Sequence, residues 1–179
     1  MKIEKTNFSD LFLITPTIFT DNRGYFMESY NQKQLDNVCG INFVQDNESL
    51  SHKGVLRGLH FQRPPFAQAK LVRVIVGSIL DIAVDLRKKS PTYGKHFSHI
   101  ISDKNKKQLF IPVGFAHGFL SLENNTIVNY KSSEFYNKDS EDSLLWNDKD
   151  LSIEWDEKNP ILTEKDMNAK KFITFESPF

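Results

Sequence analysis

The apolar residues of this chain fall in short runs of four to eight, separated by turn-forming residues, and this pattern constrains its fold more than any other feature. Runs of that length are typical of β-strands, whereas amphipathic helices repeat apolar residues every three or four positions. The pattern predicts strands over residues 11–15, 25–30, 43–51, 54–62, 70–76, 79–86, 97–102, 108–112, 115–122 and 126–135. Helices are predicted only over 31–38 and in a short stretch of the C-terminal third. Many closely spaced strands with few helices favour a mainly β fold, either a sandwich or a closed barrel.

The composition indicates one domain with no bias toward nucleic acid or membranes. At roughly 150 residues per domain, the 179 residues predict a single domain over 1–179. The 23 basic and 23 acidic residues balance, whereas nonspecific binding to nucleic acid or a membrane surface calls for a basic excess. No targeting segment or membrane span is predicted, and the single cysteine excludes an internal disulfide. We therefore expect a cytoplasmic protein.

Two predicted strands alternate in a way that suggests an internal cavity. In 79–86 the even-numbered residues are all apolar, so we expect this face to pack against another sheet. The odd-numbered face includes Asp81 and Asp85, which predicts that it meets solvent or lines a polar cavity. Lys70 shares a face with Val72 and Val74, which places it at the mouth of an apolar interior. A barrel that encloses a ligand cavity fits both patterns.

Two segments, Gly54–Gln62 and Pro112–His117, resemble the two sequence motifs of cupin barrels. Many cupins bind a metal through a His-x-His pair, a Glu and a later His. Here Gln62 replaces the second His of the pair, and no Glu follows at the needed spacing. The two remaining imidazoles, His60 and His117, are too few for a stable transition-metal site, so we expect neither a metal nor another cofactor.

Ten motifs extend the resemblance over nearly the whole chain. In order, they are residues 21–28, 45–49, 54–62, 68–74, 81–87, 90–94, 111–119, 129–131, 146–148 and 160–166. Together they resemble the dTDP-4-dehydrorhamnose 3,5-epimerase family, the metal-free cupin enzymes of dTDP-L-rhamnose biosynthesis. The resemblance implies a cupin-like jelly roll, a dTDP-sugar substrate and a homodimer that exchanges N-terminal strands. The glycan that receives the sugar, lipopolysaccharide or another, stays open.

The family inverts carbons 3 and 5 of a 4-keto-6-deoxyhexose. These carbons flank the ketone, so their protons are weakly acidic, and inversion needs a base, an acid on the opposite face and a cation at the enolate oxygen. The resemblance implies that His60 is the base and that Asp166 pairs with it. It also implies that Tyr130 is the acid and that Lys70 holds the C4 oxygen.

The remaining implied residues bind substrate. His117 would support the sugar or the same oxygen, and Asp81 would orient it. The other positions that match substrate contacts of the family are Arg23, Glu28, Gln45, Asn47, Arg57, Glu141 and Lys165. Because the family exchanges N-terminal strands, the partner chain can supply some of these contacts. Phe19 and Phe26 are candidates for stacking on thymine.

Several alternatives stay open at this point. Sequence-similar enzymes of antibiotic-sugar pathways act at one carbon only or isomerise the ketone, with nearly the same catalytic residues. A non-catalytic sugar-binding cupin and a metal-dependent cupin oxygenase belong to other classes, and the oxygenase lacks its ligands here. Tyr136 competes with Tyr130 for the role of acid.

One local irregularity is predicted from the sequence. Strict alternation would point Arg57 and His60 to opposite faces of a strand, yet both are expected near one ligand. Gly58 lies between them, and a glycine inside a strand often marks a bulge. We therefore predict a β-bulge at Gly58 that aims both side chains at the same side.

Overall fold

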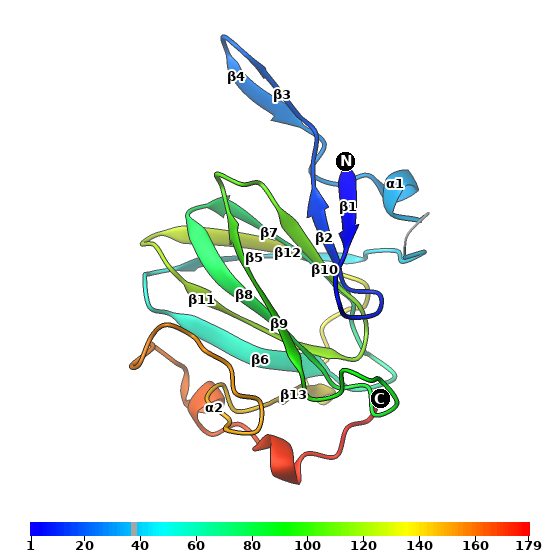
Figure 1. Cartoon of the computed structure of the whole chain (residues 1–179), viewed down its shortest axis with the longest axis vertical. Helices are drawn as coiled ribbons and strands as arrows, with labels where there is room; N and C mark the ends of the chain where they lie inside the picture. The colour runs from blue at the N-terminus through cyan, green and yellow to red at the C-terminus, as the bar shows by residue number, and fades with distance from the viewer. Residues whose placement is uncertain (37–38) are drawn as a thin grey trace.

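Two antiparallel sheets face each other in this protein (Figure 1). The computed structural model describes residues 1–36 and 39–179. The six-stranded sheet has the order β1 (Lys2–Lys5), β2 (Phe12–Thr15), β10 (Gln108–Ile111), β7 (Lys70–Val76), β12 (Thr126–Ser132), β5 (Gln45–Ser51). The five-stranded sheet has the order β13 (Glu141–Ser143), β6 (Leu56–Gln62), β11 (Phe115–Ser121), β8 (Ser78–Asp85), β9 (His96–Ser102).

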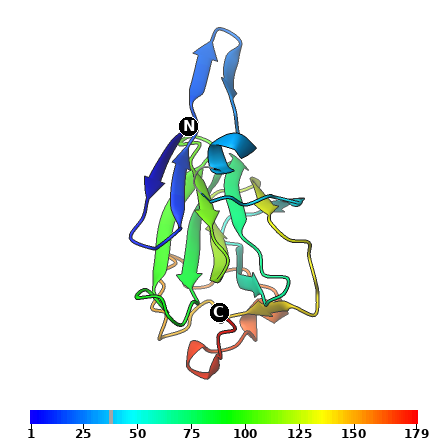
Figure 2. The same ribbon diagram turned by 90° about the vertical axis from the view of Figure 1, so that its right-hand side faces the viewer.

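A separate hairpin and three short helical segments complete the described fold. Among the strands of residues 1–36 and 39–179, β3 (Ile18–Asp21) and β4 (Gly24–Met27) pair only with each other, and they project away from the two sheets (Figures 1 and 2). The helical segments are α1 (Gln32–Asp36), α2 (Glu164–Met167) and a 3₁₀ turn at Phe172–Thr174. No helix within residues 1–36 and 39–179 is long and apolar enough to cross a membrane.

The predicted fold class is confirmed, because the chain is mainly β with a cupin-like arrangement of sheets. The strand predicted at 70–76 has those bounds, and most others agree within two or three residues. The prediction missed β1, β3 and β13, which are three or four residues long and lack an apolar run. The last two residues of the helix predicted at 31–38 lie outside the described residues.

Apolar side chains form one cluster between the sheets and one on each outer face. The inner cluster includes Val72 and Val74 of β7 and Ile79 and Ala83 of β8. The segment around α1 covers part of the outer face of the six-stranded sheet, where it packs on side chains of β1, β2, β7 and β10. The C-terminal segment covers the five-stranded sheet with buried side chains that include Leu144, Leu151, Trp155 and Phe175. Each fully buried side chain of this size contributes about 1.5–3 kcal/mol, so the C-terminal segment is firmly attached to the barrel.

The prediction that the even-numbered face of β8 packs against another sheet was wrong. The odd-numbered face agrees with one of its two predicted settings, a polar cavity, because Asp81 pairs with cavity-lining His117. The apolar even-numbered face, with Ile82 and Val84, packs against the C-terminal segment and not against another sheet. The odd-numbered face lies between the sheets, where Ile79 and Ala83 contact the inner cluster and Asp81 is fully buried. The strand alternation was read correctly, but alternation alone does not tell which face a second layer covers.

The bulge predicted at Gly58 is confirmed. Between two paired positions, β6 advances three residues, from Arg57 to His60, while β11 advances only two. The extra residue keeps Arg57 and His60 on the inner face, while Leu56, Leu59 and Phe61 all join the outer cluster. Gly58 has φ +123°, and a Cβ there would lie 2.5 Å from Gly118 Cα and 2.7 Å from His117 O. Only glycine fits at this position.

We expect Gly58→Ala to lower the free energy of unfolding by roughly 3 kcal/mol or more, because it combines backbone strain with a clash against β11. Gly54→Ala is the matched control: Gly54 also has a positive φ, +82°, but open space around its Cβ position. That control should cost only the strain of a left-handed backbone, about 1–2 kcal/mol. Urea unfolding measures both changes. Equal costs for the two variants would contradict the close packing of Gly58 on β11.

Candidate active site

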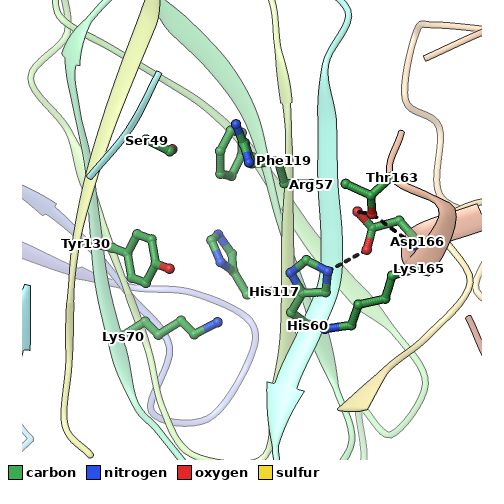
Figure 3. A pocket seen from close by; sticks show the side chains of 10 residues that line it. All are labelled: Ser49, Arg57, His60, Lys70, His117, Phe119, Tyr130, Thr163, Lys165 and Asp166. Carbon is green, nitrogen blue, oxygen red and sulfur yellow. Dashed lines mark hydrogen bonds and ion pairs between the residues drawn. The ribbon is translucent and has the colours of Figure 1, made fainter. Parts of the chain in front are cut away.

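A cavity of about 270 Å³ opens between the two sheets (Figure 3). Strands β5, β7 and β12 line it from one sheet, and β6 and β11 line it from the other. The segment that contains α2 closes one side. The lining residues are Ser49, Arg57, His60, Lys70, His117, Phe119, Tyr130, Thr163, Lys165 and Asp166. All four residues predicted as catalytic are therefore brought to one cavity.

His60 and Asp166 form a close pair on one side of the cavity. His60 Nε2 lies 2.5 Å from Asp166 Oδ1. An ionised carboxylate accepts the Nε2 proton, which leaves the lone pair on Nδ1. That second ring nitrogen is on the side of the imidazole that faces Tyr130 (Figure 3). The pair thus presents a base to the cavity and stabilises the imidazolium that forms when the base takes a proton.

Asp166 is almost fully buried, yet it is held in the ionised form. Burial raises the pKa of its carboxyl, but hydrogen bonds from His60 and Thr163 and nearby positive charge outweigh that effect and lower the pKa. Thr163 Oγ1 donates to Asp166 Oδ2 at 2.9 Å. Both carboxylate oxygens therefore have a hydrogen-bond donor.

Tyr130 and Lys70 approach the cavity from the opposite sheet. Burial raises the pKa of the Tyr130 phenol, so it carries its proton at neutral pH. Burial lowers the pKa of Lys70 to about 8. The negative charges of Asp81 and Glu141 raise this pKa, but by less than burial lowers it. Lys70 Nζ lies 5.7 Å from the centre of the Tyr130 ring. A proton donor and a cation thus lie side by side, facing the base.

His117 and Asp81 form a second imidazole–carboxylate pair inside the barrel. His117 Nε2 lies 2.6 Å from Asp81 Oδ1, as expected for a carboxylate that orients the ring. Burial lowers the pKa of His117, and the charge of Asp81 only partly offsets this. The imidazole is then neutral near pH 7, with its proton on Nε2 and a lone pair on Nδ1. In that state Nδ1 of His117 is able to accept a hydrogen bond.

Charged side chains lie around the rim of the cavity. Arg57 is held against β5, because its Nε donates to Ser51 Oγ at 3.1 Å and its Nη2 donates to the Leu50 carbonyl at 3.2 Å. Lys165 Nζ lies 2.6 Å from Glu141 Oε2. Burial alone would raise the pKa of Glu141, but Lys165 lowers it. Arg57 and Lys165 are suited to hold the anionic part of a ligand.

Four of the predicted substrate-binding residues lie away from the cavity in this chain. Arg23 is at the turn of the β3–β4 hairpin, where it pairs with Asp21 at 2.6 Å. Glu28 accepts hydrogen bonds from Asn31 and Gln34 on the same side of the molecule as the hairpin. Gln45 and Asn47 bind each other on β5 at 2.9 Å, beyond the residues that line the cavity.

The competing tyrosine lies outside the cavity. Tyr136 is 57% exposed, and its hydroxyl donates to Glu141 Oε2 at 3.2 Å. The geometry therefore favours Tyr130 as the acid.

Three lining residues were not singled out from the sequence. Ser49 alternates with Gln45 and Asn47 on β5, so the period of two was a usable signal. Its hydroxyl is buried and has no partner in the described part of the chain. Thr163 and Asp166 have the spacing of a helix capping box, which was a second signal. Phe119 lies two residues after His117 in the strand predicted at 115–122, so the same period of two was a signal here as well.

Gln62 occupies the position where many cupins have a metal-binding His. It is buried, and its amide donates to the Phe66 and Phe135 carbonyls and accepts from the Asn137 N–H. This side chain therefore connects β6 to the segments that contain Phe66 and Phe135–Asn137 through hydrogen bonds. Within residues 1–36 and 39–179, no three His, Cys, Asp or Glu side chains are grouped closely enough to hold a metal ion.

This arrangement is suited to moving protons across a ligand. The base comes from the five-stranded sheet and the phenol from the six-stranded sheet, so a ring held between them can lose a proton on one face and gain one on the other. The neighbouring Lys70 ammonium is suited to hold an oxygen that becomes negative after the first proton has left and before the second arrives.

Comparisons with known proteins show the family to which this chain is related. The family profile described as dTDP-4-dehydrorhamnose 3,5-epimerase matches residues 5–173. A dTDP-4-dehydrorhamnose 3,5-epimerase from Shigella flexneri is 50% identical, over 97% of each chain. The crystal structure of such an epimerase from Bacillus anthracis, with TDP and pyrophosphate bound, is 48% identical and covers 95% of this chain and 98% of its own, with a TM-score of 0.92. A dTDP-6-deoxy-D-glucose-3,5-epimerase from Legionella pneumophila, in complex with dTDP-4-keto-L-rhamnose, is 42% identical over 98% of this chain and 94% of its own, with a TM-score of 0.94.

We expect Lys70 to titrate near pH 8, well below an exposed lysine at about 10.4, because the interior disfavours its charged form. Asp81→Asn should lower the Lys70 pKa further, since the carboxylate raises it. Asp46→Asn, which removes the partner of Lys131 on the outer face of the sheet, is the control and should leave Lys70 unchanged. NMR of lysine-labelled protein measures each titration. A Lys70 pKa near 10 would contradict burial of its ammonium.

Proposed function

Since this chain belongs to the dTDP-4-dehydrorhamnose 3,5-epimerase family, we propose that its reaction takes place in the cavity between the sheets, with His60, Asp166, Tyr130 and Lys70 as the catalytic groups. The reaction inverts carbons 3 and 5 of dTDP-4-dehydro-6-deoxy-D-glucose and gives dTDP-4-dehydro-L-rhamnose. One observation carries the assignment of roles: the imidazole and the phenol reach the same cavity from opposite sheets.

His60 starts each inversion as the base. Its Nδ1 takes the proton from the carbon beside the ketone, and the electron pair of the C–H bond moves into the ring and onto the C4 oxygen. Asp166, 2.5 Å from Nε2, stabilises the imidazolium that results. A well-positioned proton transfer of this kind contributes about 10²–10⁴-fold to the rate.

Tyr130 completes the inversion from the other face. The enolate collapses back to the ketone as carbon takes the phenol proton, which leaves tyrosinate and imidazolium. The two groups then exchange protons with water before the second carbon reacts. The raised pKa of Tyr130 keeps the phenol protonated before each turnover.

Lys70 and His117 hold the sugar while charge develops. The ammonium of Lys70 donates to the C4 oxygen as it becomes negative, and a preorganised donor of this kind is worth about 3–4 kcal/mol. His117, neutral and oriented by Asp81, accepts from a sugar hydroxyl. The fixed Asp81 contact keeps this acceptor in place during both inversions.

The diphosphate and nucleoside extend beyond the cavity. A volume of about 270 Å³ is small for a whole nucleotide sugar, because ligand sites are typically about 300–1,000 Å³. Arg57 and Lys165 at the rim supply the positive charge that a diphosphate needs, and Glu141 positions Lys165. Gln45 and Asn47 continue along β5 on the same face as Ser49, and so they extend the binding surface.

The active form that we propose is a homodimer of single-domain cupin chains in the cytoplasm. The β3–β4 hairpin supports the dimer: it pairs with no other strand in the described part of the chain, and Phe19 and Phe26 are 62% and 67% exposed. A lone two-stranded hairpin is marginally stable in water, so it needs a surface to pack on. On a partner chain it would deliver Arg23 and Glu28 to the partner's substrate.

Proton exchange in D₂O tests the assignment of the base and the acid. The wild-type enzyme should incorporate deuterium at C3 and C5 of dTDP-4-keto-6-deoxyglucose and invert both carbons, as followed by NMR. His60→Asn should slow exchange at both carbons by about 10²–10⁴-fold, because no base removes either proton. Tyr130→Phe should keep exchange, since His60 returns a proton to the same face, but lose inversion.

Tyr136→Phe is the matched control and should keep both exchange and inversion. Loss of inversion in Tyr136→Phe with retention in Tyr130→Phe would reverse the assignment of the acid. Exchange at one carbon only would make the protein a single-carbon epimerase. Tight binding without any exchange would make it a binding protein.

Mixing two variants tests the shared site. We expect Arg23→Glu and His60→Asn to be poorly active alone, and their mixture after subunit exchange to regain activity. Half of the mixed dimers are heterodimers, each with one intact site, so about a quarter of the sites recover. If Arg23 instead serves its own chain's site, the heterodimer contains no intact site and activity does not return.

A further inference from the structure

We propose that Thr163 is a positioning residue, which holds Asp166 in the orientation that it needs to pair with His60. This inference rests on the proposed role of His60 as the base. Thr163 lies at the rim of the cavity, at the start of α2 (Figure 3).

Thr163 contacts Asp166 twice. The backbone N–H of Asp166 donates to Thr163 Oγ1 at 3.2 Å, so this oxygen acts as the acceptor of a helix N-cap. The hydroxyl proton of the same group goes to Asp166 Oδ2 at 2.9 Å. One hydroxyl thus fixes both the backbone and the carboxylate of Asp166, while the other carboxylate oxygen remains for His60.

The chain just before Thr163 is fastened to the strand that contains His60. Ile161 forms an isolated parallel bridge with Val55, its N–H donates to the Gly54 carbonyl at 2.8 Å, and its carbonyl accepts from the Leu56 N–H at 3.0 Å. The contacts therefore form a closed ring, from β6 through Ile161 and Thr163 to Asp166 and back to His60 on β6.

Asp166 needs such support because of the element that carries it. Helix α2 has only four residues, and a helix of that length is not stable on its own. The second carboxylate of the site shows the contrast. Asp81 lies in the middle of β8, paired with β9 on one side and β11 on the other, and its Oδ2 has no hydrogen-bond partner in the described chain. A rigid strand positions Asp81, whereas Asp166 depends on a side-chain contact.

Thr163 can be tested through the pattern of kinetic effects. Thr163→Val keeps the shape of the side chain but removes the hydroxyl. We expect kcat and the rate of deuterium exchange to fall about fivefold to tenfold, with KM within about twofold, because substrate contacts stay in place. Thr163→Ser restores the hydroxyl and should return both rates to within about twofold of wild type. Loss of rate in both variants would overturn the role of the hydroxyl.

A double-mutant cycle separates positioning from a general structural effect. In an Asp166→Ala background, Thr163→Val should change the residual rate by less than about twofold, because the hydroxyl has no carboxylate to hold. A structural role of Thr163 would give the same loss of rate in both backgrounds, and that result would overturn the proposal.

Thr92→Val is the matched control. Thr92 Oγ1 donates to the buried Asp85 Oδ2 at 2.7 Å, a contact of the same type away from the cavity, so kcat and KM should stay at wild-type values. The single variants also separate the two hypotheses. If His60→Asn and Asp166→Ala retain full activity, the proposed function of the site fails. If they lose activity while Thr163→Val stays at the wild-type rate, only the positioning role fails.

Discussion

The site depends on one extra residue in β6, at Gly58. A regular strand from Leu56 to Gln62 would send either His60 or Arg57 to the outer face, where the C-terminal segment packs. The bulge keeps both on the inner face and keeps Leu59 and Phe61 outside. It requires close backbone contact with β11, and Gly118 allows this, because a Cβ there would lie 2.9 Å from the Arg57 carbonyl. A packing constraint between two glycines therefore determines which side chains enter the cavity.

The two-sheet architecture explains how the proposed acid and base come to lie on opposite sides of a ligand. Each sheet supplies one proton-transfer group and one polar neighbour: His60 and His117 from one side, Tyr130 and Lys70 from the other. Buried charges are costly unless they are paired, and Asp81 is buried close to Lys70 and His117. The same desolvation that costs stability raises the pKa of Tyr130 and brings the Lys70 pKa to about 8.

The outer layers are as important to the site as the barrel itself. The C-terminal segment packs on the five-stranded sheet through residues such as Trp155, and this attachment brings Asp166 to His60. At the other end, the β3–β4 hairpin carries Arg23 away from its own cavity. A chain whose C-terminal segment completes part of its own site, while its N-terminal hairpin projects away from the sheets, is well suited to the proposed dimer.

Much of this protein followed from the sequence alone. The apolar runs determined a mainly β fold, and the order of motifs indicated the family, since both are local patterns that survive without knowledge of packing. The spacing around Gly58 even indicated the bulge. The sequence did not determine which face of β8 is internal, because alternation defines two faces but not the layer that covers each. It also did not determine which of the predicted substrate contacts lie far from the cavity of their own chain, as Arg23 and Glu28 do. Those features depend on contacts between segments far apart in the chain, and only the tertiary structure brings such segments together.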